Sequence, residues 1–245
     1  LRRVSKTQIL QYNGAFLSLL GLEHFPDPSS LRRFLNRLSP QTIRQLVRLH
    51  DRLRASLARA ARASSSLVLD LDSVVITLYG HQQGARLGYN PKKRGRRSYH
   101  PLLCFEAQGG QFWHGSLRPG NTTANTAVLP FLERCRAKIP AGMHRARVRL
   151  RADAGFFSGR MFHWLEQQGW SYVVVARQHP GIRRAALGAK FISLGGGWQV
   201  GEFLLRAGRW PQPRRFVVVR RPVPEDPAEA AQLQLFRHQQ YAYRY

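Results

Sequence analysis

Residues 67–78 read LVLDLDSVVITL, an apolar run interrupted by two carboxylates, Asp70 and Asp72. The run is rich in Val, Leu and Ile, which predicts a buried β-strand. Because side chains alternate between the two faces of a strand, Asp70 and Asp72 share one face. An ionised carboxylate in such surroundings is costly unless a cation pairs with it or a metal binds it. This strand therefore marks a candidate site.

A third carboxylate, Asp153, follows a second predicted strand at Arg147–Ala152. In open α/β sheets, binding sites gather at the carboxyl ends of strands. Aspartates at the ends of adjacent strands would offer the hard oxygen ligands that divalent cations prefer, as two-metal phosphoryl transfer requires. A second interpretation stays open, in which Asp70 pairs with an arginine and Asp153 caps the next helix.

The surrounding segments predict an α/β fold built on one mixed sheet. The predicted strands are 67–78, 101–107, 111–117, 147–152 and 172–176, and the predicted helices in this part are 125–138 and 159–168. Gly109-Gly110, between the second and third strands, is typical of a hairpin.

Changes of composition divide the chain into four expected parts. Residues 1–66 are predicted to be a helical region, 67–189 the α/β core, 190–221 a β-strand insertion, and 222–245 a loop and the start of a further part. The predicted helix that begins near Pro40 carries many arginines, namely Arg44, Arg48, Arg52, Arg54, Arg59 and Arg62. A DNA-contacting helix and a solvated helix face both explain this pattern.

Charge is the strongest compositional signal: 39 Lys and Arg against 13 Asp and Glu give a net charge of +26. Such a field attracts polyanions, and nucleic acid is the polyanion we expect. No apolar run approaches the ~18–20 residues that span a bilayer, so no membrane partner is expected. The only two cysteines, Cys104 and Cys135, form no metal-binding or disulfide pattern and fit a reducing cytoplasm.

A basic loop interrupted by Gly95 is suited to binding phosphates, although a solvated loop would look the same. Its members are Lys92, Lys93, Arg94, Arg96 and Arg97. Three scattered histidines, His81, His100 and His114, suggest ordinary core or surface roles.

Five segments in a fixed order resemble the transposases of bacterial insertion sequences, of the DDE group with a ribonuclease-H-like catalytic domain. They are residues 69–80, 89–95 (YNPKKRG), 98–103 (SYHPLL), 117–121 (LRPGN) and 151–157 (RADAGFF), and the likeness spans about residues 20–245.

The resemblance implies a ribonuclease-H-like mixed sheet that brings Asp72 and Asp153 together as the first two catalytic acids. Asp70 would be a supporting metal ligand or an alternative to Asp72. The implied cofactor is Mg²⁺, for which Mn²⁺ substitutes, and the implied chemistry is strand cleavage and transfer. The partners would be terminal-repeat and target DNA, with a homodimer in the DNA complex, in the bacterial cytoplasm at the nucleoid. Arg118 and Asn121 join the basic loop as expected DNA contacts.

The family's third acid is a Glu on a helix after the insertion, and none of Glu202, Glu225 and Glu229 matches it. We therefore expect a fragment that ends before this residue and is inactive alone. Two alternatives remain: a transposase remnant that binds DNA without catalysis, and a basic RNA-binding protein, which gives no reason for Asp72 and Asp153.

Overall fold

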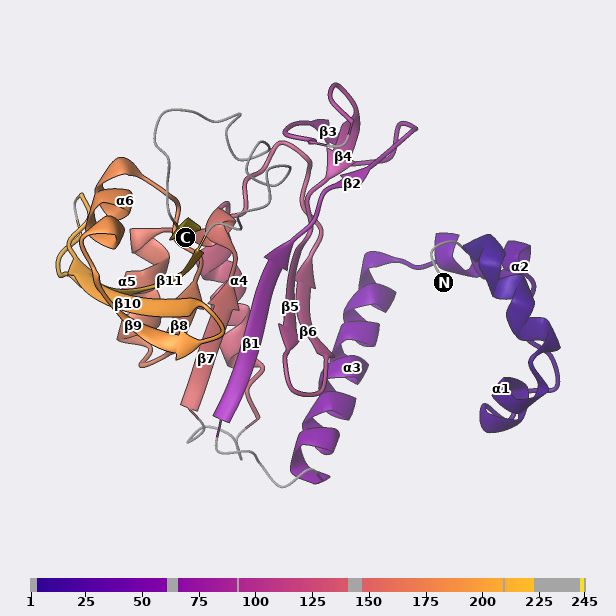
Figure 1. Cartoon of the computed structure of the whole chain (residues 1–245). Coiled ribbons are helices and arrows are strands. Elements are labelled where there is room, and N and C mark those ends of the chain that lie inside the picture. The colour runs from indigo at the N-terminus through magenta and orange to yellow at the C-terminus, as the bar shows by residue number, and fades with distance from the viewer. Residues whose placement is uncertain are drawn as a thin grey trace. The chain divides into compact units, whose positions relative to one another are not determined.

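The computed structural model describes residues 4–60, 66–91, 93–140, 147–208, 210–222 and 243–244. The chain forms two compact units, which are described separately here (Figure 1). The first unit joins Leu1–Ser65 to Lys138–Ala146, and the second joins Ser66–Ala137 to Arg147–Tyr245.

The first unit is helical where the sequence predicts helices. It contains the 3₁₀ helix η1 (Val4–Tyr12) and helices α1 (Gly14–Leu19), α2 (Pro28–Asn36) and α3 (Pro40–Ala60). The Asp27 carboxylate caps α2 by accepting hydrogen bonds from the backbone N–H groups of Ser29 and Ser30, at 2.6 and 3.1 Å. These bonds favour the charged carboxylate and lower the pKa of Asp27 to about 2.

One ion pair joins the two segments of this unit. Lys138 Nζ lies 2.7 Å from Asp51 Oδ1 on α3, and Arg54 of the same helix donates to the Lys138 carbonyl at 2.6 Å. Arg54 is buried, so this arginine of the predicted basic face is used inside the unit. Arg62 lies outside the described residues.

The second unit is built on a five-stranded mixed sheet in the order β6-β5-β1-β7-β8. The strands are β1 (Ser66–Ser73), β5 (Leu102–Glu106), β6 (Gln111–Ser116), β7 (Arg147–Ala152) and β8 (Ser171–Val174). β1 is antiparallel to β5 and parallel to β7, and β7 is parallel to β8. The hairpin β5–β6 followed by two parallel strands on the other side of β1 is the ribonuclease-H-like arrangement, which confirms the expected fold class.

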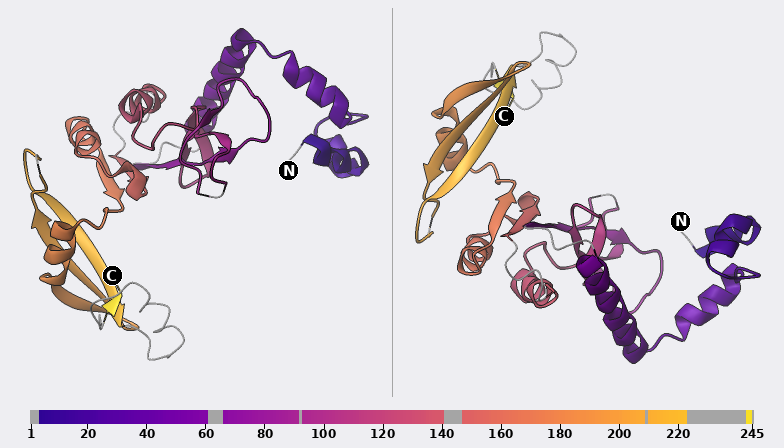
Figure 2. Two further views of the ribbon diagram at one scale, coloured as in Figure 1. Left: turned by 90° about the horizontal axis from the view of Figure 1, so that it is seen from above. Right: turned by 90° about the horizontal axis from the view of Figure 1, so that it is seen from below.

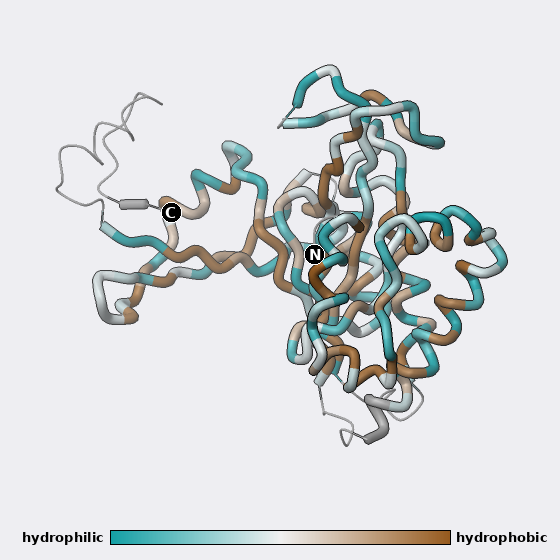
Figure 3. The backbone as a smooth tube through the Cα atoms, turned by 90° about the vertical axis from the view of Figure 1, so that its right-hand side faces the viewer, coloured by the Kyte–Doolittle hydropathy of each residue, from teal (hydrophilic) through white to brown (hydrophobic). Residues whose placement is uncertain are grey.

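Period-two alternation in β1 separates the core from the candidate site. Leu67, Leu69 and Leu71 are buried, whereas Asp70 and Asp72 lie on the opposite, more open face. The core is completed by helices α4 (Val128–Ala137) and α5 (Gly159–Gln167), which pack near β6 and β8. Apolar stretches fall in the strands of the central sheet (Figure 3).

The predicted strand 67–78 is wrong in its second half. β1 ends at Ser73, and Ile76–Thr77 form a separate strand, β2, in a small sheet of order β2-β4-β3. The segment that contains the predicted basic loop supplies the other two strands, β3 (Arg86–Leu87) and β4 (Arg97–Tyr99). Pairing between segments ten or more residues apart creates this sheet, and no local periodicity reveals it. We call it the basic arm, because it carries Lys93, Arg94, Arg96 and Arg97.

The β-rich segment forms a second sheet of order β12-β11-β10-β9. Its strands are β9 (Lys190–Gly195), β10 (Trp198–Leu205), β11 (Arg214–Pro222) and β12 (Tyr243–Arg244). Helix α6 (Pro180–Leu187) contacts β10 and lies against this sheet (Figure 2). The sequence did not predict α6, because this short helix buries only Ile182 and shows no extended apolar stripe. Most of residues 222–245, including Glu225 and Glu229, lie outside the described residues.

Candidate active site

The carboxyl ends of β1 and β7 bring two aspartates side by side. The last parallel pair in the register is Leu71 with Ala152, and the next residue on each strand is Asp72 and Asp153 respectively. Asp153 keeps an extended backbone, with φ −79° and ψ 178°, so it continues the line of β7. Neighbouring strands are ~4.8 Å apart, which sets the scale of the separation between the two backbones.

Asp70 lies two residues before Asp72, on the same face of β1, and forms an ion pair with Arg151. Arg151 donates from Nε to Asp70 Oδ1 at 2.5 Å and from its terminal nitrogen to Asp70 Oδ2 at 2.6 Å. This two-point pair raises the pKa of Arg151. Both Asp70 oxygens are therefore engaged by an arginine, as the second interpretation of the sequence expected for this residue.

Among the described residues, Asp72 and Asp153 accept hydrogen bonds from backbone groups only. Asp72 Oδ1 accepts from the Ser73 N–H at 2.7 Å, and Asp153 Oδ1 accepts from the Gly155 N–H at 2.9 Å. The latter bond caps the 3₁₀ helix η3 (Ala154–Phe156). Within the described part of the chain, neither carboxylate forms an ion pair.

The pair of carboxylates fits a divalent cation. Two adjacent like charges repel each other, and hard carboxylate oxygens are the ligands that Mg²⁺ prefers. Their second oxygens, Oδ2 of Asp72 and Oδ2 of Asp153, are not engaged by the hydrogen bonds described above. Among the described residues, no third His, Cys, Asp or Glu completes a metal-binding cluster. The site thus offers two protein ligands.

The basic arm extends beyond the carboxyl end of β1, the end that carries Asp72 (Figure 1). Lys93, Arg94, Arg96 and Arg97 are exposed, and the Arg96 guanidinium lies 5.7 Å from the centre of the Tyr79 ring. Lys92 lies outside the described residues. Figure 3 shows the arm as largely hydrophilic.

The two residues expected to contact DNA from the LRPGN segment differ in their surroundings. Asn121 is exposed in a turn. Arg118 is only 6% exposed, and its guanidinium donates to the carbonyls of His100 and Thr126 at 3.0 and 2.5 Å. This placement does not support the prediction of Arg118 as a DNA contact, because the guanidinium donates hydrogen bonds to backbone carbonyls inside the fold.

Glu202 is paired within the β9–β12 sheet. Its carboxylate accepts two hydrogen bonds from Arg215 on the neighbouring strand, one of them from Nε at 2.8 Å, and these bonds lower the pKa of Glu202. Of the two tryptophans in this part, Trp210 packs among Phe157, Phe162 and Phe216, and the Arg214 guanidinium covers its ring at 4.5 Å. Trp198 is 45% exposed.

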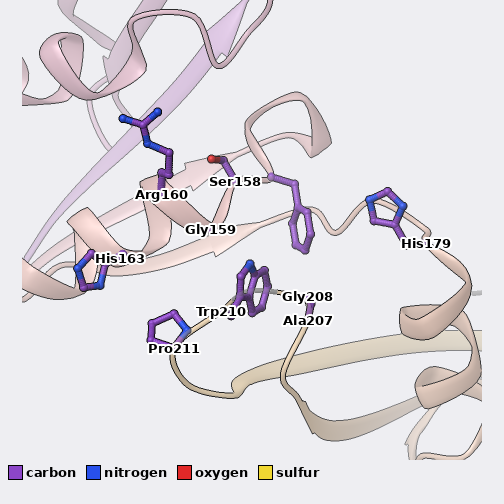
Figure 4. A pocket seen from close by; sticks show the side chains of 10 residues that line it. Ser158, Gly159, Arg160, His163, His179, Ala207, Gly208, Trp210 and Pro211 are labelled. Carbon is purple, nitrogen blue, oxygen red and sulfur yellow. The ribbon is translucent and has the colours of Figure 1, made fainter.

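A hollow of about 720 Å³ lies between the start of α5 and the turn that joins β10 to β11 (Figure 4). Its basic lining residues are Arg160, His163 and His179, and Trp210 forms part of the wall. A Cβ at Gly159 would lie 2.5 Å from Trp210 Nε1, so the indole fits only because residue 159 is glycine. Arg160 points away from this indole in Figure 4.

Sequence reasoning gave three residues near the carboxylates no part in the site. His100 Nε2 lies 3.1 Å from Ser73 Oγ, beside Asp72. Beside Asp153, Asn125 Nδ2 donates to the Gly155 carbonyl at 2.8 Å, and Arg177 donates to the carbonyls of Ala154 and Gly155 at 2.9 and 3.2 Å. A signal was available for His100, which lies in the SYHPLL segment.

A ribonuclease-H-like sheet with adjacent acids at the ends of its central parallel strands defines a class of nucleic-acid-processing domains. Within that class, the profile described as "Transposase DDE domain group 1" matches residues 15–231. The chain belongs to this family, and the resemblance seen in the sequence is confirmed.

Two solved structures similar to the chain are distant from it in sequence. The piggyBac transposase synaptic complex with hairpin DNA is 12% identical, with a TM-score of 0.41, and the match covers 79% of this chain and 43% of that chain. The Mos1 transposase paired-end complex with the left transposon end is 13% identical, with a TM-score of 0.34, over 74% of this chain and 60% of that chain. The chain therefore spans between about two fifths and three fifths of these proteins. No curated protein matches it. No helix in the described ranges is long and apolar enough to cross a membrane.

Proposed function

We propose that this chain is the catalytic domain of an insertion-sequence transposase, in which Asp72 and Asp153 bind Mg²⁺ or Mn²⁺ during cleavage and transfer of DNA strands. The observation that carries the proposal is the adjacent placement of these two carboxylates at the carboxyl ends of β1 and β7, where no described residue forms an ion pair with either. Membership of the DDE family supplies the reaction class.

Each residue of the site has a defined task in this proposal. Asp72 and Asp153 would hold divalent cations, and the backbone N–H groups of Ser73 and Gly155 orient one oxygen of each carboxylate. Divalent cations bound there would supply activation of the attacking oxygen and stabilisation of the leaving one. Asp70 balances the positive charge of Arg151 next to the site and is not needed as a metal ligand in this proposal.

DNA is the proposed partner, with the basic arm as its main contact. Lys93, Arg94, Arg96, Arg97 and Asn121 would bind the phosphate backbone near the cleaved end, and Lys92 would join them. The net charge of +26 supports the choice of partner. The proposal includes a homodimer in the DNA complex and a place at the bacterial nucleoid.

A second candidate, a DNA-binding transposase remnant without catalysis, is favoured by one observation: the described residues bring only two carboxylates together. Titration of Mn²⁺ followed by electron paramagnetic resonance tests the metal ligands on which the catalytic proposal depends. If the catalytic proposal holds, the protein binds Mn²⁺, and Asp72→Asn and Asp153→Asn each weaken binding strongly. Equal Mn²⁺ binding by both variants and the wild type would reject these ligands.

A further inference from the structure

The loop between β6 and α4, residues 117–127, bonds directly to the Gly155 carbonyl beside Asp153 and, through the His100 side chain, to the Ser73 hydroxyl beside Asp72. We propose that this loop fixes the separation of Asp72 and Asp153, with His100 and Asn125 as the positioning residues, one for each acid. The inference rests on the proposed metal site and adds the residues that hold its two ligands in register.

His100 connects the loop to Asp72. Its Nδ1 lies 2.7 Å from the Thr122 carbonyl oxygen and its Nε2 lies 3.1 Å from Ser73 Oγ. A carbonyl only accepts, so Nδ1 carries the proton and Nε2 accepts the hydroxyl hydrogen of Ser73. The backbone N–H of Ser73 in turn donates to Asp72 Oδ1 at 2.7 Å. Two sets of hydrogen bonds, joined through the covalent frame of Ser73, thus connect the loop to the first carboxylate.

Asn125 connects the same loop to Asp153. Its Nδ2 donates to the Gly155 carbonyl at 2.8 Å, and the Gly155 N–H donates to Asp153 Oδ1 at 2.9 Å. The contact is close: a Cβ at Gly155 would lie 2.9 Å from Asp153 Oδ1 and 3.1 Å from the Ala124 Cβ. The loop therefore packs directly on the turn that carries the second carboxylate.

Arg118 makes the loop rigid. Its buried guanidinium binds the His100 carbonyl on one side and the Thr126 carbonyl on the other. The backbone of the first positioning residue is thereby fixed to the segment that carries the second, Asn125. Two adjacent carboxylates repel each other, so without this frame we expect them to separate in the absence of a cation.

If His100 and Asn125 position the two aspartates, their loss should weaken metal binding, because groups hydrogen-bonded behind metal ligands typically contribute about 10–100-fold in affinity. The test is Mn²⁺ titration of the full 245-residue chain, followed by electron paramagnetic resonance. His100→Asn keeps a donor near the Nδ1 position but does not reach Ser73, and Ser73→Ala removes the hydroxyl while the backbone N–H stays. Each variant is expected to bind Mn²⁺ about 10-fold or more weakly.

Two comparisons make the result specific. Ser73→Thr keeps a hydroxyl and should restore wild-type affinity, and the double variant His100→Asn/Ser73→Ala should bind no more weakly than either single variant. His81→Asn, an exposed histidine on the basic arm, is the matched control and should bind normally. Thermal unfolding of every variant shows whether a loss of affinity is a loss of fold. Asn125→Ala should weaken binding through Asp153 in the same way.

The outcomes separate this inference from the proposed function. If Asp72→Asn abolishes Mn²⁺ binding while His100→Asn, Ser73→Ala and Asn125→Ala bind like the wild type, the positioning role is wrong and the metal site stands. If the wild type itself binds Mn²⁺ no better than Asp72→Asn, the metal site and the positioning role both fail.

Discussion

Arg151 pairs with Asp70 through two hydrogen bonds, directly before the point where Asp72 and Asp153 come side by side. The pair assigns different tasks to two carboxylates that the sequence places on one face of a strand. Asp70 balances the charge of the arginine on the neighbouring strand, whereas no residue in the described part of the chain forms an ion pair with Asp72.

This division predicts different effects of two similar substitutions. Asp70→Asn should leave Mn²⁺ binding nearly intact, whereas Asp72→Asn should remove it. The Asp70–Arg151 pair is half-exposed and screened by water, so its loss should change the free energy of unfolding little. Mn²⁺ titration and urea unfolding of both variants make the measurement, with Arg151→Gln as the control for the pair. Loss of Mn²⁺ binding in Asp70→Asn alone would make Asp70 the ligand instead.

Arg118 is expected to act on stability and not on DNA binding. Arg118→Met leaves buried carbonyls without a donor, and each such group costs about 1–3 kcal/mol, so we expect at least about 2 kcal/mol of destabilisation. Urea unfolding gives this value. Asn121→Ala, in the same segment but exposed, should unfold like the wild type. A stable Arg118→Met protein with weakened DNA affinity would return Arg118 to the DNA surface.

The Glu166–Arg214 pair joins α5 to β11 and should make stability depend on pH. Arg214 donates to both Glu166 oxygens, at 2.7 and 2.8 Å, and chiefly for this reason the pKa of Glu166 is lowered from 4.5. A carboxyl whose pKa is lower in the folded state stabilises the fold above its unfolded pKa, and this contribution is lost as the pH falls below about 4.5.

Glu166→Gln should therefore cost about 1–3 kcal/mol at neutral pH and much less in acid, because charge-assisted hydrogen bonds contribute on that scale. Urea unfolding of the wild type and the variant, at neutral pH and again below about pH 4.5, measures the difference in unfolding free energy. Glu202→Gln is the control, since the pair of Glu202 with Arg215 is exposed. An equal loss at both pH values would mean that shape and not charge holds the two elements together.

Salt dependence should identify the DNA surface. Log affinity falls with log salt by about 0.9 for each phosphate contacted, so removing three contacts should reduce the slope by up to roughly 3. We expect this for Arg94, Arg96 and Arg97 changed together to Ala. The charge-matched variant changes Arg44, Arg48 and Arg52 on α3, which are exposed as well. A reduced slope in the second variant only would assign DNA binding to the helix.

The sequence predicts those parts of the fold that depend on residues close together in the chain. Strands β5, β6 and β7 come from local alternation and turn residues, and the acids stand out because carboxylates are rare in apolar strands. The basic arm could not be predicted, since its pairing of Arg86 with Ser98 spans a loop. The tight contact of Gly88 with Gly120 is equally non-local: a Cβ on Gly88 would lie 1.9 Å from the Gly120 carbonyl oxygen.

The outer frame of the site was missed for the same reason. Ser73 lies far from His100 in the chain, as Asn125 does from Gly155, and only the fold brings each pair into contact. A histidine in sequence shows no partner, so a core role and a positioning role look the same. The family resemblance supplied the two acids, and the contacts around them had to come from three-dimensional structure.

Cleavage of DNA by the 245-residue chain depends on how many metal ligands the chain supplies. Two carboxylates give a divalent cation few anionic ligands, and a pair of cations needs more negative charge to offset their mutual repulsion. Because the described residues supply only Asp72 and Asp153, we expect the 245-residue chain to bind DNA in Mg²⁺ without nicking it. The assay is nicking of a labelled duplex that carries the element's own terminal repeat, with Asp72→Ala as the inactive control.

Robust nicking that Asp72→Ala abolishes would mean that a third ligand acts within this chain. Glu202→Gln is then the first variant to measure, because freeing Glu202 requires only that it leave the exposed Arg215. Nicking that survives in Asp72→Ala would instead reject the two-aspartate site.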